Sequence, residues 1–572
     1  MGYGWHGRYL RIDLGSGAAQ AVEIPPERLR QFVGGVGLGA WICLWEGGAG
    51  ADPLAPEAPL VFAFSPLVGT PLTTSAKFAV VARSPLTGLL NDAISSSHFA
   101  IAGKRTGYDA LVVVGRAPDL AHVLVDDGDV SVVACPEWRG RPAPECTLDG
   151  FRTAAIGPAG EHLVRFATMS NDGRHAGRGG IGAVMGAKNL KALSVRGTSA
   201  AALFDTEGVV AAARKLSKAS FGPATAKYRE LGTIANVLVF NRLNGLPTRN
   251  FLAGHFEGAA AVSAEELHAM DRVGRASCAS CTIGCEHIFK SPSGGHVRLE
   301  YESVFALGPL LGIDDRGFVL EAAAHCDEFG LDTISAGGTI AMAMEARFGG
   351  LAFGETHGVL LMLERIAHRS GDGDLLAEGS AIAAKRLGRP ELAMTVKGLE
   401  IPGYDPRTMQ SMALGFAVGT RGADHNRSGA YELDFSDEAD RLDFDPEHAR
   451  KVVVIENRTA AMDALILCKF LRGVFEDFER EGAELLRLVT GEEIDLTEVG
   501  ANVCALRKEF NVRAGWAPAS DTLPQRLLEG ALSPGKLRAM ITTYYRARGW
   551  DDEGYVPGEI AKNLGLPCHP SR

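Results

Sequence analysis

The feature that most constrains this chain is a run of three cysteines within eight residues. Cys278, Cys281 and Cys285 form a C-x2-C-x3-C motif, and Gly284 precedes the last of them. A tight loop of this kind can turn three thiolates toward one face of a cubic iron–sulfur cluster, which needs a fourth ligand. A zinc site with a fourth Cys or His, or three coincidental thiols, are the alternatives. The spacing favours an iron–sulfur cluster.

Spacing alone cannot identify the fourth ligand. His287 stands close to the motif, although a lone histidine is more often structural. The other candidates are Cys43, Cys135, Cys146, Cys326, Cys468, Cys504 and Cys568. In a long chain without a signal peptide, so many cysteines favour ligands or buried thiols over a disulfide framework.

Length and composition set the broad class. A chain of 572 residues exceeds the size of one hydrophobic core, so we expect two to four domains. With 46% apolar and 22% charged residues it reads as globular, and it has no uninterrupted apolar stretch long enough to span a membrane. The N-terminus has no basic segment followed by an apolar one, which predicts a cytoplasmic protein. A net charge of −11 argues against nucleic acid as a partner.

The pattern of the chain changes near residue 203. Residues 1–203 contain short β-prone runs separated by glycine-rich turns, such as residues 77–82 and 110–114. From residue 204 the periodicity becomes helical, and a loop rich in Pro and Gly at 397–407 separates two helical regions. We therefore predict an α+β protein with a β-rich domain at 1–203 and helical domains at 204–400 and 401–572.

Two further segments carry a family resemblance. Asp327-Glu-Phe-Gly-Leu-Asp332 and Asp463-Ala-Leu-Ile-Leu-Cys468 resemble the paired D-x-x-G-L-(C/D) pterin-binding motifs of the aldehyde:ferredoxin oxidoreductase family. Residues 82–88, 107–115, 156–161 and 176–192 extend the likeness over almost the whole chain. The resemblance implies a β-sheet base that, with the helical domains, encloses a buried pterin-metal cofactor.

The resemblance also implies a cofactor set. Two pterin-dithiolene cofactors would coordinate tungsten or molybdenum, which has no protein ligand, and a Mg²⁺ ion would bridge the pterin phosphates. By position in the motifs, the cofactor contacts would be Lys77, Arg178, Gly179, Gly180, Asp327, Gly330, Leu331, Asp332, Thr333, Asp463, Leu467 and Lys469.

The second motif supplies the fourth cluster ligand by the same resemblance. In the family the cysteine that closes this motif binds the cluster, which assigns Cys468. This copy has Ile466 in place of glycine. A β-branched residue suits that position if glycine served packing, and resists it if glycine served a positive φ.

The segment 176–192 is the most distinctive glycine-rich stretch. Its glycines allow close backbone approach, and Arg178, Lys188 and Lys191 add positive charge, as a phosphate-bearing cofactor requires. An ordinary glycine-rich turn is the plain alternative. No G-x-G-x-x-G fingerprint within a βαβ unit accompanies it, so we do not expect a nicotinamide cofactor.

Glu302 and His425 are the acid–base candidates that the resemblance implies, with Glu300 as the nearest competitor. A carboxylate and an imidazole near a metal suit the proton transfers of aldehyde oxidation. Glu321 resembles the position at which some family members bind a metal between two subunits of a homodimer. Its spacing to His325 is E-x-x-x-H and not the E-x-x-H of those members, so an ordinary helix-surface pair is the simpler interpretation. The stretch Ser95-Ser-Ser-His98-Phe stands where the family has a glycine-rich loop. His98 could therefore contact the cofactor or the substrate, or lie on the surface.

Three functions follow from these motifs. The first is oxidation of an aldehyde to the carboxylic acid, with electrons passed through a [4Fe–4S] cluster to ferredoxin or to a small iron–sulfur subunit. The second keeps the cofactors in the tungsten subunit of a reductase that acts on a CoA thioester or an aromatic ring. The third is an iron–sulfur or zinc interaction protein without catalysis.

Overall fold

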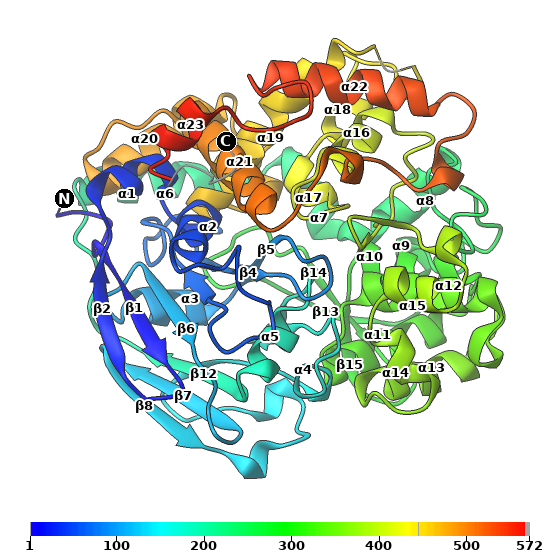
Figure 1. Ribbon diagram of the computed structural model, residues 1–572, viewed down its shortest axis with the longest axis horizontal. Helices are drawn as coiled ribbons and strands as arrows, with labels where there is room; N and C mark the ends of the chain where they lie inside the picture. Colours follow the sequence, from blue (N-terminus) through cyan, green and yellow to red (C-terminus); the bar gives the residue numbers. More distant parts are fainter. Residues whose placement is uncertain (1, 444, 567–572) are drawn as a thin grey trace.

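The structure of the chain, a computed structural model, describes residues 2–443 and 445–566 (Figure 1). All strands of the two large sheets lie in residues 8–196, and helices dominate from residue 206 onward. This arrangement confirms the predicted α+β class. In Figure 1 the sheets, blue to cyan, occupy the lower left, and the helices, green to red, lie to the right and above.

The first sheet has six strands in the order β2-β1-β6-β3-β4-β5. β1 and β6 run parallel, and the other neighbours are antiparallel. The strands are β1 Arg8–Asp13, β2 Ala19–Glu23, β3 Leu60–Ala63, β4 Lys77–Arg83, β5 Leu90–Ser96 and β6 Ala110–Val114. β3 and β6 are buried along their whole length, because helices cover one face and a second sheet lies on the other.

The second sheet also has six strands, in the order β11-β10-β9-β12-β7-β8. Its strands are β7 Ala121–Asp126, β8 Asp129–Ala134, β9 Arg152–Ala155, β10 Met169–Asn171, β11 Arg174–Ala176 and β12 Leu190–Arg196. One apolar core joins the two sheets through side chains such as Phe62, Phe78 and Val123. The short helices α3 (His98–Lys104) and α5 (Ile181–Ala187) contribute to this core.

Helices build most of the rest of the molecule. They include α6 Thr206–Ser220, α10 Tyr301–Leu307, α11 Arg316–Phe329, α12 Thr333–Ala346, α13 His357–Ala367, α16 Gln410–Val418, α19 His448–Leu465, α20 Phe478–Thr490, α21 Leu496–Arg513 and α22 Pro534–Ala547. α19 packs on α21 and on α2 (Gly35–Trp45), and α2 in turn covers β3 and β4. A small sheet of β13 (Arg272–Ala276), β14 (Glu286–Lys290) and β15 (His296–Leu299) flanks the cysteine run.

Both D-x-x-G-L motifs are helix ends. α11 stops where Gly330 takes φ 78°, and Asp332 then caps α12 by accepting hydrogen bonds from the N–H groups of Ile334 and Ser335. α19 stops in the same way at Ile466, whose φ is 64°. Isoleucine therefore occupies the left-handed region that the family's glycine favours, and its side chain is fully buried.

Gly35 leaves the space that this buried isoleucine occupies. A Cβ on Gly35 would lie 2.4 Å from the Asp463 carbonyl oxygen and 2.5 Å from Ile466 Cδ1. Gly47 has a positive φ too, but a Cβ there would meet nothing within 4 Å. We expect Gly35→Ala to lower the free energy of unfolding by about 1–3 kcal/mol more than Gly47→Ala does, because only the first adds overpacking. Urea unfolding of the two variants measures this difference, and equal losses would refute the steric explanation.

No helix in the described part of the chain is both long and apolar enough to cross a membrane.

Candidate active site

A cavity of about 450 Å³ lies where the first sheet meets the helical part of the chain. Its walls come from β4, β5, β11, the start of α10, the turn between α11 and α12, and the turn after α19. The predicted site residues that line it are Lys77, Arg178, Cys278, Cys285, Glu302, Asp327, Leu331, Asp332, Thr333, His425, Asp463, Leu467, Cys468 and Lys469. Segments far apart in sequence therefore converge on one chamber.

Gly179 and Gly180 do not line the cavity, and they shape it through the backbone. Both have φ 82°. A Cβ on Gly179 would overlap Asn91, and one on Gly180 would lie 2.2 Å from the Arg165 carbonyl oxygen. The lining residues of this segment are Gly177 and Arg178. A side chain at either glycine would thus displace Asn91 of β5 or the backbone at Arg165.

The prediction that Lys188 and Lys191 supply charge to the cofactor is wrong. Lys188 Nζ donates to the Pro56 carbonyl oxygen at 2.8 Å, and Lys191 Nζ donates to that of Arg141 at 2.7 Å and pairs with Glu161. Both side chains are buried away from the cavity. Lys188 follows α5 and Lys191 lies in β12, and neither element brings its ammonium group to the cavity.

Two threonines join the cysteine run to the second motif. The Thr74 N–H donates to the Ser280 carbonyl oxygen at 2.7 Å, and Thr74 Oγ1 accepts from the Cys468 N–H at 3.2 Å. Thr73 Oγ1 accepts from the Thr282 N–H at 3.0 Å. Thr74 therefore holds Cys468 beside the loop of the other three cysteines. Nothing in the sequence pattern had indicated these threonines.

The four cysteines surround Lys77, the first residue of β4. Burial lowers the pKa of this ammonium, but the facing thiols, Cys468 foremost, outweigh that effect and raise it. Within the described residues no three His, Cys, Asp or Glu side chains stand close enough to hold a single metal ion. Four half-exposed thiols spread around one volume fit a cluster better than a tetrahedral zinc ion, whose bonds to sulfur are only about 2.3 Å long.

The competing ligands lie elsewhere. Cys43, Cys135, Cys146, Cys326 and Cys504 are buried and do not line the cavity, whereas Cys568 lies outside the described residues. His287 Nε2 is 3.1 Å from the Tyr228 carbonyl oxygen, as a structural histidine would be. Among the described candidates for the fourth ligand, Cys468 is therefore the one that lies beside the motif.

A buried network of charges forms the wall behind the second motif. Asp463 Oδ2 lies 3.2 Å from Arg427 Nη1, and its Oδ1 lies 2.9 Å from Lys469 Nζ. Arg427 also pairs with Asp92, which Arg507 reaches at 3.3 Å. Burial lowers the pKa of Lys469 to about 8. Asp92 and Arg507 were not predicted, because no local motif marks a partner some 300 or 400 residues away.

The chamber has cationic and polar groups that suit a phosphate-bearing, ring-containing cofactor. Arg178, Arg421, Arg427 and Lys469 all line it. Buried Arg421 Nε makes no hydrogen bond within the described residues. Asp332, besides capping α12, stands 3.4 Å from Arg178 Nε. Guanidinium forks match phosphate oxygens, and carboxylates accept from ring N–H groups, so the donors and acceptors fit a pterin with a phosphate tail.

Glu302 and His425 lie next to each other in the wall of the cavity. Glu302 Oε1 lies 3.5 Å from His425 Nδ1, and neither atom makes a hydrogen bond within the described residues. Glu302 Oε2 accepts from the Gly403 N–H at 3.0 Å, and the ring of Tyr404 stacks on His425 at 4.7 Å. The carboxyl and the imidazole are thus held in place from behind, with one unpartnered atom each.

Burial acts in opposite directions on the two groups. It raises the pKa of Glu302 to about 8 and lowers that of His425 to about 4, since it disfavours the charged form of each. Asp424 partly offsets the effect on His425. At neutral pH the pair therefore holds one proton and carries no net charge, which is suited to accepting or donating a proton at the unpartnered atoms.

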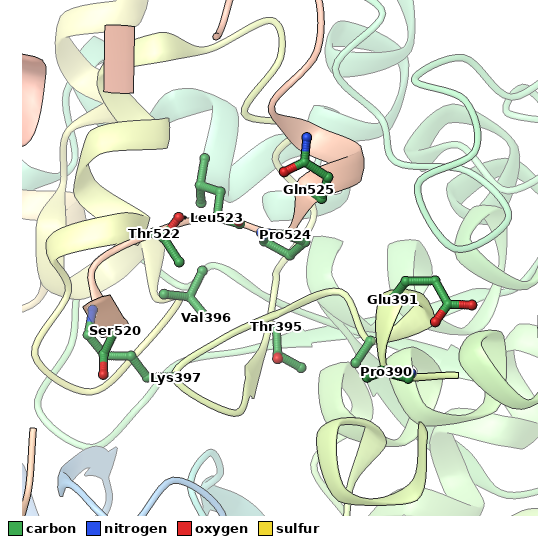
Figure 2. Close-up of a pocket in the computed structure, with 11 residues that line it drawn as sticks. Pro390, Glu391, Thr395, Val396, Lys397, Ser520, Thr522, Leu523, Pro524 and Gln525 are labelled. Carbon is green, nitrogen blue, oxygen red and sulfur yellow. Dashed lines mark hydrogen bonds between the residues drawn. The ribbon is translucent and has the colours of Figure 1, made fainter. Parts of the chain in front are cut away.

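The remaining candidates lie outside this chamber. His98 is exposed at the start of α3, where its N–H donates to Asp172, so the surface interpretation holds. Glu321 and His325 lie on α11 and do not line the cavity. A second, smaller pocket at residues 390–397 and 520–525 also stands apart (Figure 2). Its labelled side chains include no pair of facing titratable groups.

Two family descriptions match nearly the whole chain. Residues 9–197 match "Aldehyde ferredoxin oxidoreductase, N-terminal domain", and residues 209–566 match "Aldehyde ferredoxin oxidoreductase, domains 2 & 3".

Curated relatives agree with these matches. The tungsten-containing aldehyde ferredoxin oxidoreductases of Pyrococcus furiosus and Thermococcus kodakarensis are each 36% identical over 99% of this chain and 99% of their own length. An aliphatic sulfonate oxidoreductase, WOR-like subunit, of Pyrococcus furiosus is 25% identical over 99% of this chain and 97% of its own.

A solved structure shares the fold. It is the active site complex BamBC of benzoyl coenzyme A reductase with 1,5-dienoyl-CoA, which matches at a TM-score of 0.86 and 23% identity. The match covers 99% of this chain and 98% of the other.

Proposed function

The chain belongs to the aldehyde ferredoxin oxidoreductase family and is an oxidoreductase, and on this premise we propose that it oxidises an aldehyde to the carboxylic acid. The observation that carries the proposal is the Glu302–His425 pair, which faces a chamber that also meets Lys77 and the cysteines. The reaction consumes one water and releases two electrons and two protons, so it needs both a proton acceptor and an electron exit in one chamber.

We assign the cofactors by residue. Arg178, Arg421, Arg427 and Lys469 would hold the phosphates and rings of two pterins that carry tungsten or molybdenum, with Mg²⁺ between the phosphates. Cys278, Cys281, Cys285 and Cys468 would hold a [4Fe–4S] cluster. When bound, the metal would accept the two electrons of the substrate, and the cluster would carry them singly toward the surface.

The protein's own part is to position and to move protons. With Glu302 ionised, its Oε1 accepts a proton from the water that adds to the carbonyl carbon. His425, neutral at pH 7 by its lowered pKa, can donate a hydrogen bond to the carbonyl oxygen through one ring nitrogen. Tyr404 holds the imidazole plane, and the Gly403 N–H holds the carboxylate. Each group thus has one anchored side and one reactive side.

The pH dependence follows from the raised pKa of Glu302. Because the base form is required, we expect kcat/KM to rise about tenfold per pH unit below about 8 and to level above it. The raised pKa also makes stability depend on pH. The folded carboxyl binds its proton more tightly than the unfolded one, so this group favours the folded state below its unfolded pKa and loses that contribution as pH rises through about 8. Viologen-coupled rates from pH 6 to 9.5 measure the dependence of kcat/KM on pH. A flat profile would argue against Glu302 as the base.

The proposal is tested on anaerobically purified protein. Tungsten or molybdenum, pterin and iron are quantified, and viologen reduction is then followed with a panel of aldehydes and, separately, with acyl-CoA substrates. We expect pterin, iron and aldehyde-dependent reduction. Activity with acyl-CoA substrates alone would indicate that the site is that of a reductase. Bound iron or zinc without pterin would indicate an interaction protein without catalysis.

A further inference from the structure

We propose that the surface around β13 is the docking site for an acidic iron–sulfur electron carrier of the ferredoxin type; this rests on the proposed function, since it names where the electrons leave. We call it the β13 surface and define it by Arg229, Met270, Arg272, Val273 and Arg275. β13 is the edge strand of its sheet and leads directly into the cysteine run.

The β13 surface lies against the cysteines. Arg275 is three residues before Cys278, and a Cβ on Gly284 would lie 3.5 Å from Arg275 Nε. Arg275 Nη1 donates to the Arg229 carbonyl oxygen at 3.2 Å, which ties β13 to α7 (Ala226–Glu230). Ser277 and Ser280 of the cysteine loop are exposed. A carrier seated here would therefore stand close to the four thiols, as short-range electron transfer requires.

Its charges are available to a partner. In the described part of the chain, Arg229, Arg272 and Arg275 have no carboxylate within 4.0 Å, whereas the nearby acids Glu266 and Asp271 are engaged by Arg316. Glu230 is the one exposed acid that adjoins these arginines in sequence. In a chain of net charge −11, a basic surface beside the electron exit would steer an acidic partner that the rest of the molecule repels.

Apolar side chains complete the surface. Met270 is 59% exposed and Val273 is 50% exposed, between and beside the arginines. Phe221, also 59% exposed, lies under the Arg229 guanidinium at 4.5 Å. Charge on an edge strand also discourages unwanted strand pairing, but that role does not explain large apolar side chains left open beside it. Apolar contacts within a rim of charge are typical of a protein interface.

The test reverses two charges in the full-length holoenzyme. Arg272→Glu with Arg275→Glu is compared with wild type for aldehyde-dependent reduction of an acidic [4Fe–4S] ferredoxin and of methyl viologen, at several ionic strengths. We expect the KM for ferredoxin to rise about tenfold or more at low salt, with a weaker salt dependence, and the viologen rate to stay unchanged. Arg105→Glu, at an exposed arginine that follows α3, is a control for a charge reversal away from the β13 surface and should change neither.

Three outcomes would overturn the proposal. The first is an unchanged KM for ferredoxin, and the second is an equal effect of Arg105→Glu on that KM. The third is that the wild type is a dimer which the double reversal dissociates, because the surface would then be the interface with a second copy of this chain. If the reversal lowered the viologen rate, Arg272→Gln with Arg275→Gln replaces it, and an unchanged ferredoxin KM there refutes docking.

Direct binding keeps this result separate from the proposed function. Calorimetric titration of oxidised ferredoxin onto the holoenzyme needs no substrate. We expect the Kd of the wild type to rise with salt, and we expect the double reversal to raise the Kd as well. Binding without any aldehyde activity would reject the proposed substrate but keep the docking surface, whereas activity with viologen and salt-independent binding would reject the surface alone.

Discussion

Replacing Glu302 by Gln is expected to lower the kcat for aldehyde oxidation by about 10²–10⁴-fold, the usual contribution of a positioned proton acceptor. Glutamine keeps the shape of the side chain and can still accept from the Gly403 N–H, so the fold and the cofactor chamber should persist. Steady-state viologen reduction measures the loss. Metal and pterin contents equal to wild type show that the chamber is still loaded.

The neighbouring Glu300 is the control for this effect. It also lines the cavity but is exposed, and the hydrogen bonds within the described residues do not anchor its carboxylate. Glu300→Gln should retain most of the activity. Full turnover in Glu302→Gln, or an equal loss in both variants, would remove Glu302 from the proton-transfer role.

Replacing Cys468 by Ser is expected to remove a cluster ligand and to cut electron delivery to ferredoxin by at least about 100-fold, since loss of even an outer partner of a metal site costs about 10–100-fold. Its thiol faces Lys77 and the other three cysteines, and its N–H is held by Thr74. Iron per chain and the electron paramagnetic resonance spectrum of the reduced protein measure the cluster directly, without reliance on turnover.

Cys504→Ser provides the matched comparison. Cys504 is a buried thiol of α21 away from the cavity, so its substitution tests the loss of a sulfur without loss of a ligand. Iron content and spectrum should match wild type. A Cys468→Ser protein with an intact four-iron cluster, or a Cys504→Ser protein that loses it, would reassign the fourth ligand.

Local sequence motifs predicted those features that depend only on neighbouring residues. The C-x2-C-x3-C run and the D-x-x-G-L segments concern a few consecutive residues, and helix ends with a capping aspartate follow from short-range hydrogen bonding. Change of periodicity near residue 203 likewise separates strands from helices, which the structure bears out at the level of fold class. The domain boundaries remain a prediction.

The same patterns could not predict the direction in which a side chain points. Lys188 and Lys191 share a glycine-rich segment with Arg178, yet only Arg178 reaches the cavity, because the two ammonium groups instead donate to the carbonyl oxygens of Pro56 and Arg141. Ile466 shows a second kind of limit. Its left-handed conformation depends on Gly35, more than 400 residues earlier, leaving room for its side chain.

The sequence by itself determined the fold class and the family, which rest on periodicity and likeness along the chain. It also predicted the four cluster cysteines, three by their spacing and Cys468 by likeness. Only the tertiary structure decided that Thr74 holds Cys468 beside the loop of the other three, and that Arg507 contacts both Asp92 and Asp463. It also brought Glu302 and His425 together in one buried place, where burial, which no single segment contains, raises the pKa of the carboxyl and lowers that of the imidazole.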